Sequence, residues 1–92
     1  MFVKITYNDS QPGSETCNSI THYLDIKSVI VNNSLNSCVV QLSRDFMLSI
    51  DHAQDVNTFV SALESGLAVF DFSNLSDQSA AYNNYGDKLN CC

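Results

Sequence analysis

The stretch "SRDFMLSIDHAQDVNTFVSALESG", residues 43 to 66, contains the change of hydrophobic period that decides the fold. Up to Ile50 the large apolar side chains stand at every second position, which is the period of a strand with one buried face. After Asp51 they stand three and four residues apart, which is the period of one helical face. The sequence therefore predicts a strand followed directly by a helix that covers the sheet.

The helix is expected at about residues 53–65, and both of its ends carry termination signals. Asp51 and Gln54 stand three residues apart, which predicts a reciprocal capping box at the first turn. Gly66 stands where helices commonly end in a left-handed residue. The predicted buried face consists of Val56, Phe59, Val60, Leu63 and Leu67.

Two strands are expected before the central hairpin. "FVKITY" (2–7) alternates apolar and polar residues, and the Asn, Ser, Pro and Gly of residues 8–19 predict a twelve-residue loop after it. Residues 20–33 are rich in β-branched side chains, which predicts a strand with a bulge near Ser28. A short helical turn at residues 20–25 is the alternative.

The next segments read as a turn and a hairpin. "NNSLNS" (32–37) is typical of a turn, since Asn tolerates positive φ and Ser bonds to nearby backbone groups. "CVVQL" and "FMLSI" flank "SRD", a connection so short that the two strands must be antiparallel neighbours. One face of this hairpin is then apolar and needs the helix as its cover.

These elements predict an α+β fold: a four- to five-stranded, mostly antiparallel sheet with one covering helix. "LAVFDF" (67–72) is the candidate fifth strand. We expect one α+β domain over residues 1–72 and a polar C-terminal tail over residues 73–92, with a turn of helix at 76–82 as its only regular element. The tail is ordered only if an apolar residue such as Leu75, Tyr82, Tyr85 or Leu89 docks on the domain.

Composition limits the classes of partner. The 92 residues include four Lys or Arg against ten Asp or Glu, a net charge of −6, and the four cations are far apart in the sequence. Binding to a phosphate backbone needs clustered cations, so direct nucleic-acid binding is not expected and a protein partner is. No apolar run reaches the roughly 18 residues of a membrane span, and the first residues lack the layout of a secretory signal. We therefore expect a cytoplasmic protein, in the host cytoplasm if a phage encodes it.

The cysteines do not follow a metal-ligand spacing. Cys17 and Cys38 stand in the body of the chain, and Cys91 and Cys92 close it. Free thiols are the expected state, with Cys38 a small core residue in a strand. A disulfide from the tail to the sheet is the alternative, and the vicinal pair would supply only two of the ligands that a soft metal needs, so no metal site is predicted.

Catalytic arrangements are also not apparent. His22 and His52 have no nucleophile at a recognisable spacing, and we expect them to be surface or capping residues. Asp51 and Asp55 lie one turn apart at the helix start, where the helix dipole favours negative charge without any catalytic role. The three glycines form no phosphate-binding cluster. The sequence therefore predicts a non-enzymatic protein without a cofactor.

The aromatic residues are the candidate binding residues. There are more of them than one helix on a small sheet can bury, and Tyr anchors protein interfaces through a rigid apolar ring with a polar tip. The alternative is that the two Phe side chains complete the core. The predicted partner-binding residues are Tyr23, Phe70, Asp71, Phe72, Tyr82 and Tyr85.

Residues 37–67, a strand hairpin followed by "NTFVSALESGL", resemble small acidic phage-encoded anti-CRISPR proteins that inhibit Cas9. Some members of that family have a three-stranded antiparallel sheet and a short helix of this pattern that ends in Gly. The chain departs from the family in its loops and tail, where Asn and Ser replace most of the acidic residues that mimic DNA. The residues that carry the resemblance are Phe59, Val60, Ser61, Ala62, Leu63 and Gly66.

Two functions follow as hypotheses. The resemblance implies a phage or mobile-element inhibitor, non-enzymatic, that blocks the surface of a host defence protein such as a CRISPR effector. The alternative is a regulatory or structural subunit that forms a homodimer through a sheet edge and inhibits nothing. Both hypotheses place the function on an exposed surface rather than in a catalytic cleft.

Overall fold

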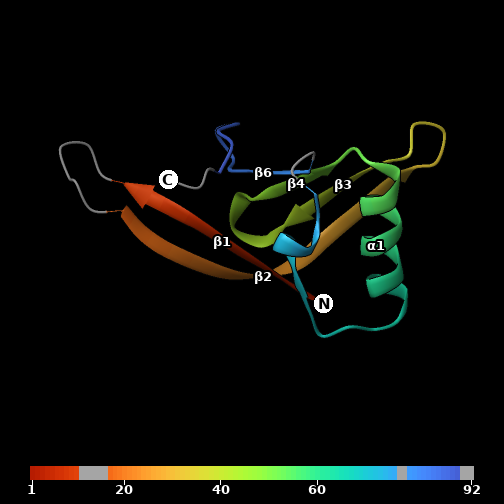
Figure 1. Cartoon of the computed structure of the whole chain (residues 1–92), viewed down its shortest axis with the longest axis horizontal. Helices are drawn as coiled ribbons and strands as arrows, with labels where there is room; N and C mark the ends of the chain where they lie inside the picture. The colour runs from red at the N-terminus through yellow and green to blue at the C-terminus, as the bar shows by residue number, and fades with distance from the viewer. Residues whose placement is uncertain (11–16, 77–78, 90–92) are drawn as a thin grey trace.

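The computed structural model describes residues 1–10, 17–76 and 79–89, which form one curled sheet and one α-helix (Figure 1). The fold is α+β, as predicted. In chain order the elements are β1 (Phe2–Ser10), β2 (Cys17–Asn32), β3 (Ser37–Leu42), the 3-10 turn η1 (Ser43–Asp45), β4 (Met47–Ile50), α1 (Ala53–Glu64), β5 (Val69–Asp71), the 3-10 turn η2 (Phe72–Asn74) and β6 (Ala80–Tyr82).

The sheet has six described strands in the order β5-β1-β2-β3-β4-β6. Every neighbouring pair is antiparallel except β1 and β5, which run parallel. The predicted hairpin and fifth strand are confirmed, while the expected four or five strands become six in a mixed sheet. The strand that was not expected is β6, where the prediction of a helical turn at 76–82 is wrong because Ala80–Tyr82 pairs with β4.

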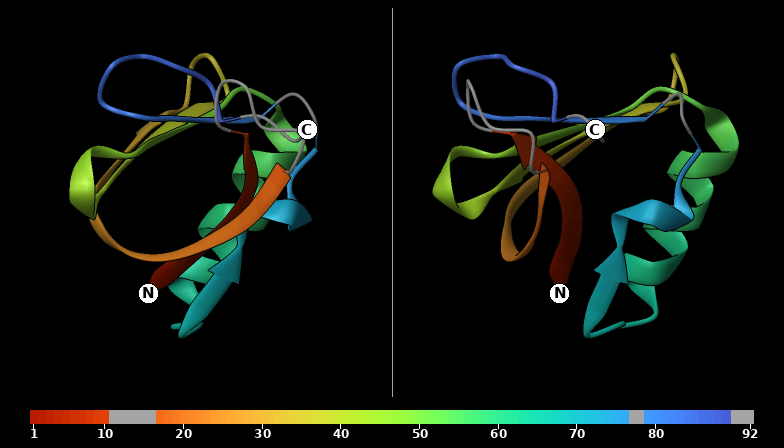
Figure 2. Two further views of the ribbon diagram at one scale, coloured as in Figure 1. Left: turned by 90° about the vertical axis from the view of Figure 1, so that its left-hand side faces the viewer. Right: turned by 60° about the vertical axis from the view of Figure 1, so that its left-hand side comes forward.

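The strand β2 belongs to both halves of the sheet. Its first part, from Cys17 to Asp25, pairs with β1, and its second part, from Ile26 to Asn32, pairs with β3. The register shifts between Ile26 and Ser28, so the bulge predicted near Ser28 is confirmed and the alternative helical turn is wrong. A bulge bends a strand and increases its twist. The sheet accordingly curls, with β1 and β2 turning away from β3, β4 and β6 (Figure 2).

The first hairpin is longer than the sequence suggests. Pairing of β1 with β2 continues to Ser10 and Cys17, so the expected loop at residues 8–19 is too long. The turn at 32–37 is confirmed: Asn32 Oδ1 accepts hydrogen bonds from the main-chain N–H groups of Ser34 and Leu35 at 3.1 and 3.2 Å.

The core lies on the concave side of the curled sheet, under α1. Alternate residues of the strands point inward, and the helix adds Phe59, which is fully buried. The ring of Phe59 meets that of Phe70 edge to face, with 5.3 Å between centroids. The buried apolar residues from the strands are Val3, Ile5, Leu24, Cys38, Val40, Leu42, Leu48, Ile50, Phe70, Ala80 and Ala81.

The sequence predicts the C-terminal end of α1 correctly and the N-terminal cap incorrectly. At the C-terminus Gly66 has φ 76°, its N–H bonds to Leu63 O, and the N–H of Leu67 bonds to Ala62 O, which together form a Schellman motif. At the N-terminus the predicted capping box is wrong. The cap residue is His52, whose side chain makes no cap bond, and the Asp51 carboxylate accepts instead from Ser49 Oγ at 3.2 Å.

The predicted apolar face of the helix is correct only in its first half. Val56 and Phe59 are buried, but Leu63 and Leu67 are 36% and 45% exposed. These two residues belong to the last turn and the segment after it, which extend beyond the edge of the core. Asp55 of the same helix is buried, and its carboxylate bonds to Ser76 and Ser79, which lie outside the helix.

We predict that Phe59→Ala lowers the free energy of unfolding by about 3–5 kcal/mol, because the residue is fully buried and truncation leaves a cavity. Leu63→Ala, in the same helix at an exposed position, is the matched control and should cost less than about 1 kcal/mol. Urea denaturation of both variants measures the difference. Equal losses would show that the helix does not cover the sheet through Phe59.

Candidate functional site

The outer face of β5, β1 and β2 carries several large apolar side chains. Val3 and Ile5 point into the core, so the alternate residues Phe2 and Lys4 point outward. Phe2 is in register with Val69 of β5, and Lys4 is in register with Tyr23 of β2 and Asp71 of β5. The exposed fractions of Phe2, Val69 and Tyr23 are 46, 42 and 58%. We call Phe2, Lys4, Tyr23, Val69 and Asp71 the edge face.

The edge face contains one ion pair. Lys4 Nζ lies 3.8 Å from Asp71 Oδ2, and Asp71 Oδ1 accepts from the N–H and the hydroxyl of Ser73 at 3.0 and 2.9 Å. The Ser73 N–H, with smaller effects of its hydroxyl and of Lys4, lowers the pKa of Asp71 although partial burial opposes this. Asp71 is therefore a fixed negative charge beside apolar side chains.

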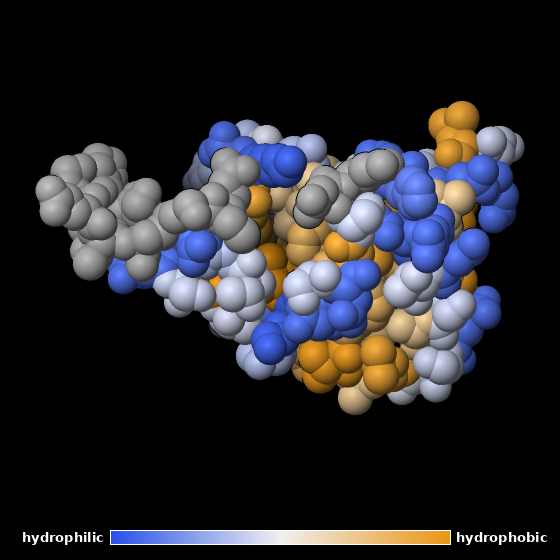
Figure 3. All heavy atoms as spheres, viewed as in Figure 1, coloured by the Kyte–Doolittle hydropathy of each residue, from blue (hydrophilic) through white to orange (hydrophobic). Residues whose placement is uncertain are grey.

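The strand β5 is an edge strand: it pairs with β1 on one side and has no neighbour among the described residues on the other. The main-chain N–H and C=O groups on this outer side can therefore bond to a strand of another protein. Hydrophobic residues gather at the lower edge of the molecule, below the N-terminal end (Figure 3). Leu67, two residues before β5, is also exposed. An apolar area next to an open strand is typical of a protein-binding surface.

The structure separates the six residues predicted to bind a partner. Tyr23 and Asp71 lie on the edge face, whereas Phe70 is buried in the core. Phe72 is partly buried beside a pocket. On the opposite edge of the sheet, Tyr82 lies in β6 and Tyr85, 84% exposed, lies in the turn after it.

Sequence reasoning missed Phe2 and Val69. The alternation of the strands could have identified both, because Phe2 precedes the buried Val3, Val69 precedes the buried Phe70, and neighbouring residues of a strand point to opposite faces. In "VFDF" alternation puts Phe70 and Phe72 on one face and Val69 and Asp71 on the other, and the parallel pairing of Phe70 with the buried Val3 shows that the face with the two Phe is the inner one.

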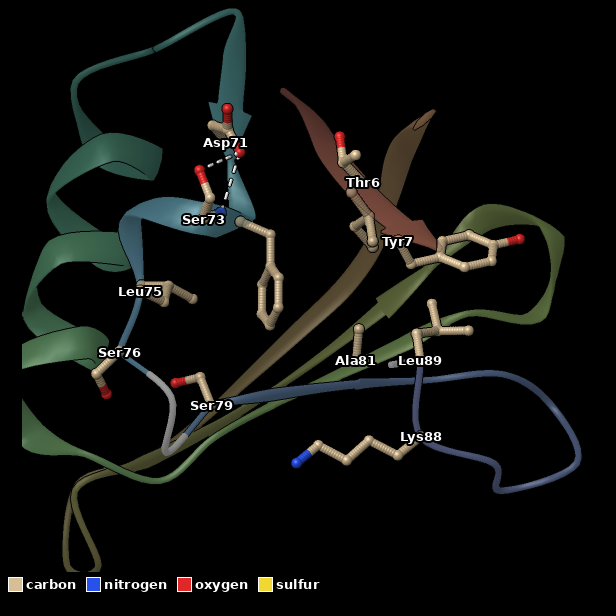
Figure 4. A pocket seen from close by; sticks show the side chains of 12 residues that line it. Thr6, Tyr7, Asp71, Ser73, Leu75, Ser76, Ser79, Ala81, Lys88 and Leu89 are labelled. Atoms are coloured by element: carbon tan, nitrogen blue, oxygen red, sulfur yellow. Dashed lines mark hydrogen bonds between the residues drawn. The ribbon is translucent and has the colours of Figure 1, made fainter. Parts of the chain in front are cut away.

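A pocket of about 510 Å³ lies between β1 and the C-terminal segment (Figure 4). Its polar groups come mainly from residues 71–76 and 79, and its apolar surface comes from side chains that also border the core. The lining residues are Ile5, Thr6, Tyr7, Asp71, Phe72, Ser73, Leu75, Ser76, Ser79, Ala81, Lys88 and Leu89.

A buried carboxylate fixes one wall of this pocket. Asp55, in the first turn of α1, accepts hydrogen bonds from the N–H and hydroxyl of Ser76 and from Ser79 Oγ, the last at 2.8 Å. Burial by itself raises the pKa of Asp55, but these bonds outweigh it, with a smaller effect of His52, so the pKa lies below its ordinary value. These bonds explain why an acid occupies the buried face of the helix.

His52 lies beside this carboxylate and helps to lower its pKa, and the Nδ1 atom of His52 is buried without a hydrogen-bond partner among the described residues. Asp55 joins the helix to Ser76 and Ser79, close to the buried Leu75.

The second histidine lies inside the curl. His22 Nε2 is 3.2 Å from Tyr7 Oη, the two rings stack at 5.6 Å, and the ring of Phe46 lies 5.0 Å from His22. The expectation that His22 is a surface residue is wrong, because its register opposite Ile5 directs it to the concave side. No group of three or more metal-ligating side chains occurs among residues 1–10, 17–76 and 79–89.

Cys38 is a buried free thiol, as predicted, and burial raises its pKa. Cys91 and Cys92 lie outside the described residues. Within the described part of the chain, no helix has both the length and the apolar character that crossing a membrane requires. Comparison of the chain with protein-family models, curated proteins and solved structures finds no match.

We predict that Asp55→Asn lowers the free energy of unfolding by about 1–3 kcal/mol at pH 7, because an amide cannot accept all of these bonds. The folded-state pKa of Asp55 lies below its ordinary value of 3.8, so the carboxylate stabilises the fold above that pH and loses its effect as the pH falls further. The difference from wild type should therefore shrink in acid. Denaturation from pH 7 to pH 2 measures it.

Asp25→Asn, at an exposed position on β2, is the matched control and should leave stability nearly unchanged at every pH. A difference between Asp55→Asn and wild type that stays constant down to pH 2 would contradict an ionised Asp55.

Proposed function

We propose that this protein is a non-enzymatic binding protein that docks on another protein through the edge face. The observation that carries the proposal is the juxtaposition of Phe2, Val69 and Tyr23, all strongly exposed, next to the open edge of β5. Placing about half of each side chain in an interface contributes roughly 1 kcal/mol per residue. Pairing along β5 adds direction and specificity to this apolar contribution.

The charge of the chain favours a basic partner surface. A net charge of −6 attracts positive surfaces at long range and raises association rates with them. Asp71 offers one fixed carboxylate inside the docking area, where a partner Arg or Lys can replace or join Lys4. Surfaces that bind nucleic acid are basic, so they belong to the class that this protein is suited to cover.

For the partner we propose a host defence protein, such as a CRISPR effector, which the chain inhibits by occupying its surface. The support is the resemblance of residues 37–67 to anti-CRISPR proteins. In the structure these residues form β3, β4 and α1, which make up much of the core. They thus act as the scaffold that holds the edge face.

Self-association through the same edge is the second candidate. A twofold axis beside β5 would pair two copies edge to edge, bring Val69 of each copy close to the axis, and cover both apolar areas. Sedimentation separates the two candidates: a monomer at micromolar concentration supports the inhibitor, whereas a stable dimer that captures no other protein supports the subunit.

We predict that the wild-type protein reduces target cleavage by purified Cas9 with its guide RNA when it is in molar excess, and that Val69→Asp abolishes the effect by charging the apolar area. Ile30→Asp is the matched control, because Ile30 is 67% exposed on the other half of the sheet. DNA cleavage assays measure all three proteins. Undiminished cleavage with wild-type protein, or equal loss of inhibition in both variants, would contradict the proposal.

A further inference from the structure

We infer that the pocket between β1 and residues 88–89 is a slot that accepts one extended peptide strand from a partner protein. The strand would pair with main-chain groups of Thr6 on one side and Lys88 on the other, and so continue the sheet between its two edges. This site shares Asp71 with the edge face and otherwise consists of different residues, and it does not rest on the function proposed above.

The first side of the slot is an unpaired strand edge. The strand β5 pairs with β1 only from Phe2 to Lys4, and beyond Lys4 no described strand lies on that side of β1. The N–H of Phe2 points toward β5, where it bonds to Ala68 O at 2.9 Å. Main-chain direction alternates along a strand, so the N–H and C=O of Thr6 point the same way, into the pocket.

The side chain of Thr6 supports this orientation. Its Oγ1 bonds to Thr21 Oγ1 at 2.9 Å, across β1 and β2 on the outer face. Figure 4 shows this side chain pointing away from the pocket that Thr6 nevertheless lines. What Thr6 presents to the pocket is therefore its main chain.

The second side of the slot is the main chain of Lys88, which forms an isolated bridge with Tyr82 of β6. Lys88 and Tyr82 are antiparallel partners, and the two hydrogen bonds around them run from Leu89 N to Ala81 O and from Asn83 N to Asp87 O, at 2.9 and 3.0 Å. This is the non-hydrogen-bonded type of antiparallel pair. The N–H and C=O of Lys88 therefore point away from β6, and Lys88 lines the pocket.

The interior of the slot suits the alternating side chains of a strand. Phe72, Leu75, Ala81 and Leu89 supply apolar surface within it, and all four are buried or pack against the core. Ser73 and Asp71 supply polar groups at one end. The volume of about 510 Å³ is within the roughly 300–1,000 Å³ typical of ligand sites. Every second side chain of the peptide would be apolar and enter the slot.

Charge favours a foreign, basic peptide over a second copy of this chain. Two copies would each bring a net charge of −6 and repel one another. Asp71 lies at one end of the slot as a carboxylate whose lowered pKa keeps it ionised at neutral pH. Lys88 also lines the slot, so the occupant is a peptide with alternating apolar residues, a Lys or Arg near the Asp71 end and no basic residue beside Lys88.

A phage-displayed library of random octapeptides tests the inference on the full-length protein. Enriched peptides should alternate apolar and polar residues, carry a basic residue, and shift the NMR signals of Thr6, Lys88 and Leu89 on binding. No enrichment, peptides with helical spacing, peptides whose shifts map to the edge face, or a dimer of the protein occupying the slot would each overturn it.

The best enriched peptide then separates strand pairing from simple apolar contact. Two twins of this peptide are each N-methylated at every second amide, one twin along the edge that faces Lys88 and the other along the edge that faces Thr6. The methylated edge cannot donate hydrogen bonds, so each twin should bind at least tenfold more weakly than the parent peptide. Thr6→Pro removes one donor and should weaken binding about tenfold, with Thr6→Val as its matched control. Equal affinities across both twins and both variants would overturn main-chain pairing.

Val69→Asp distinguishes this site from the edge face. The variant should bind the peptide as wild type does, whatever its effect on Cas9. Loss of peptide binding in Val69→Asp but not in Thr6→Pro would assign the peptide to the edge face and overturn the slot.

Discussion

The fold depends on the bulge in β2. One strand of 16 residues pairs with β1 along its first part and with β3 along its second, and the register shift between Ile26 and Ser28 lets the two halves of the sheet face each other. A flat strand of this length would spread the inward residues over a plane that one twelve-residue helix is too short to cover. Because the sheet curls, Phe59 and Phe70 meet across a closed core.

The same curl brings two distant parts of the chain together without joining them. The strand β1 and residues 88–89 face each other across the pocket, and Asp55 holds Ser76 and Ser79 along one wall. The pocket is thus a consequence of sheet geometry and of one buried carboxylate. The edge face, by contrast, lies on the outer surface and depends on the pairing of β1 with β5 and with β2.

Local patterns in the sequence predicted the elements that local interactions determine. The helix, the hairpin around residues 43–45 and the bulge near Ser28 each leave a signal within about ten residues. The strand β6 leaves none, because "AAY" has two small residues and its position depends on Asp55, which lies 21 and 24 residues before Ser76 and Ser79. The positions of Phe2 and Phe70 likewise depend on a pairing between strands at opposite ends of the domain.

Among the described residues the curled sheet is open between β1 and residues 88–89, and amide hydrogen exchange measured by NMR on the free protein tests this opening most directly. The amides of Phe2 and Leu89, bonded to Ala68 O and Ala81 O, should exchange slowly. Those of Thr6 and Lys88 should exchange at nearly unprotected rates. Protection of Thr6 and Lys88 equal to that of Phe2 and Leu89 would contradict an open sheet.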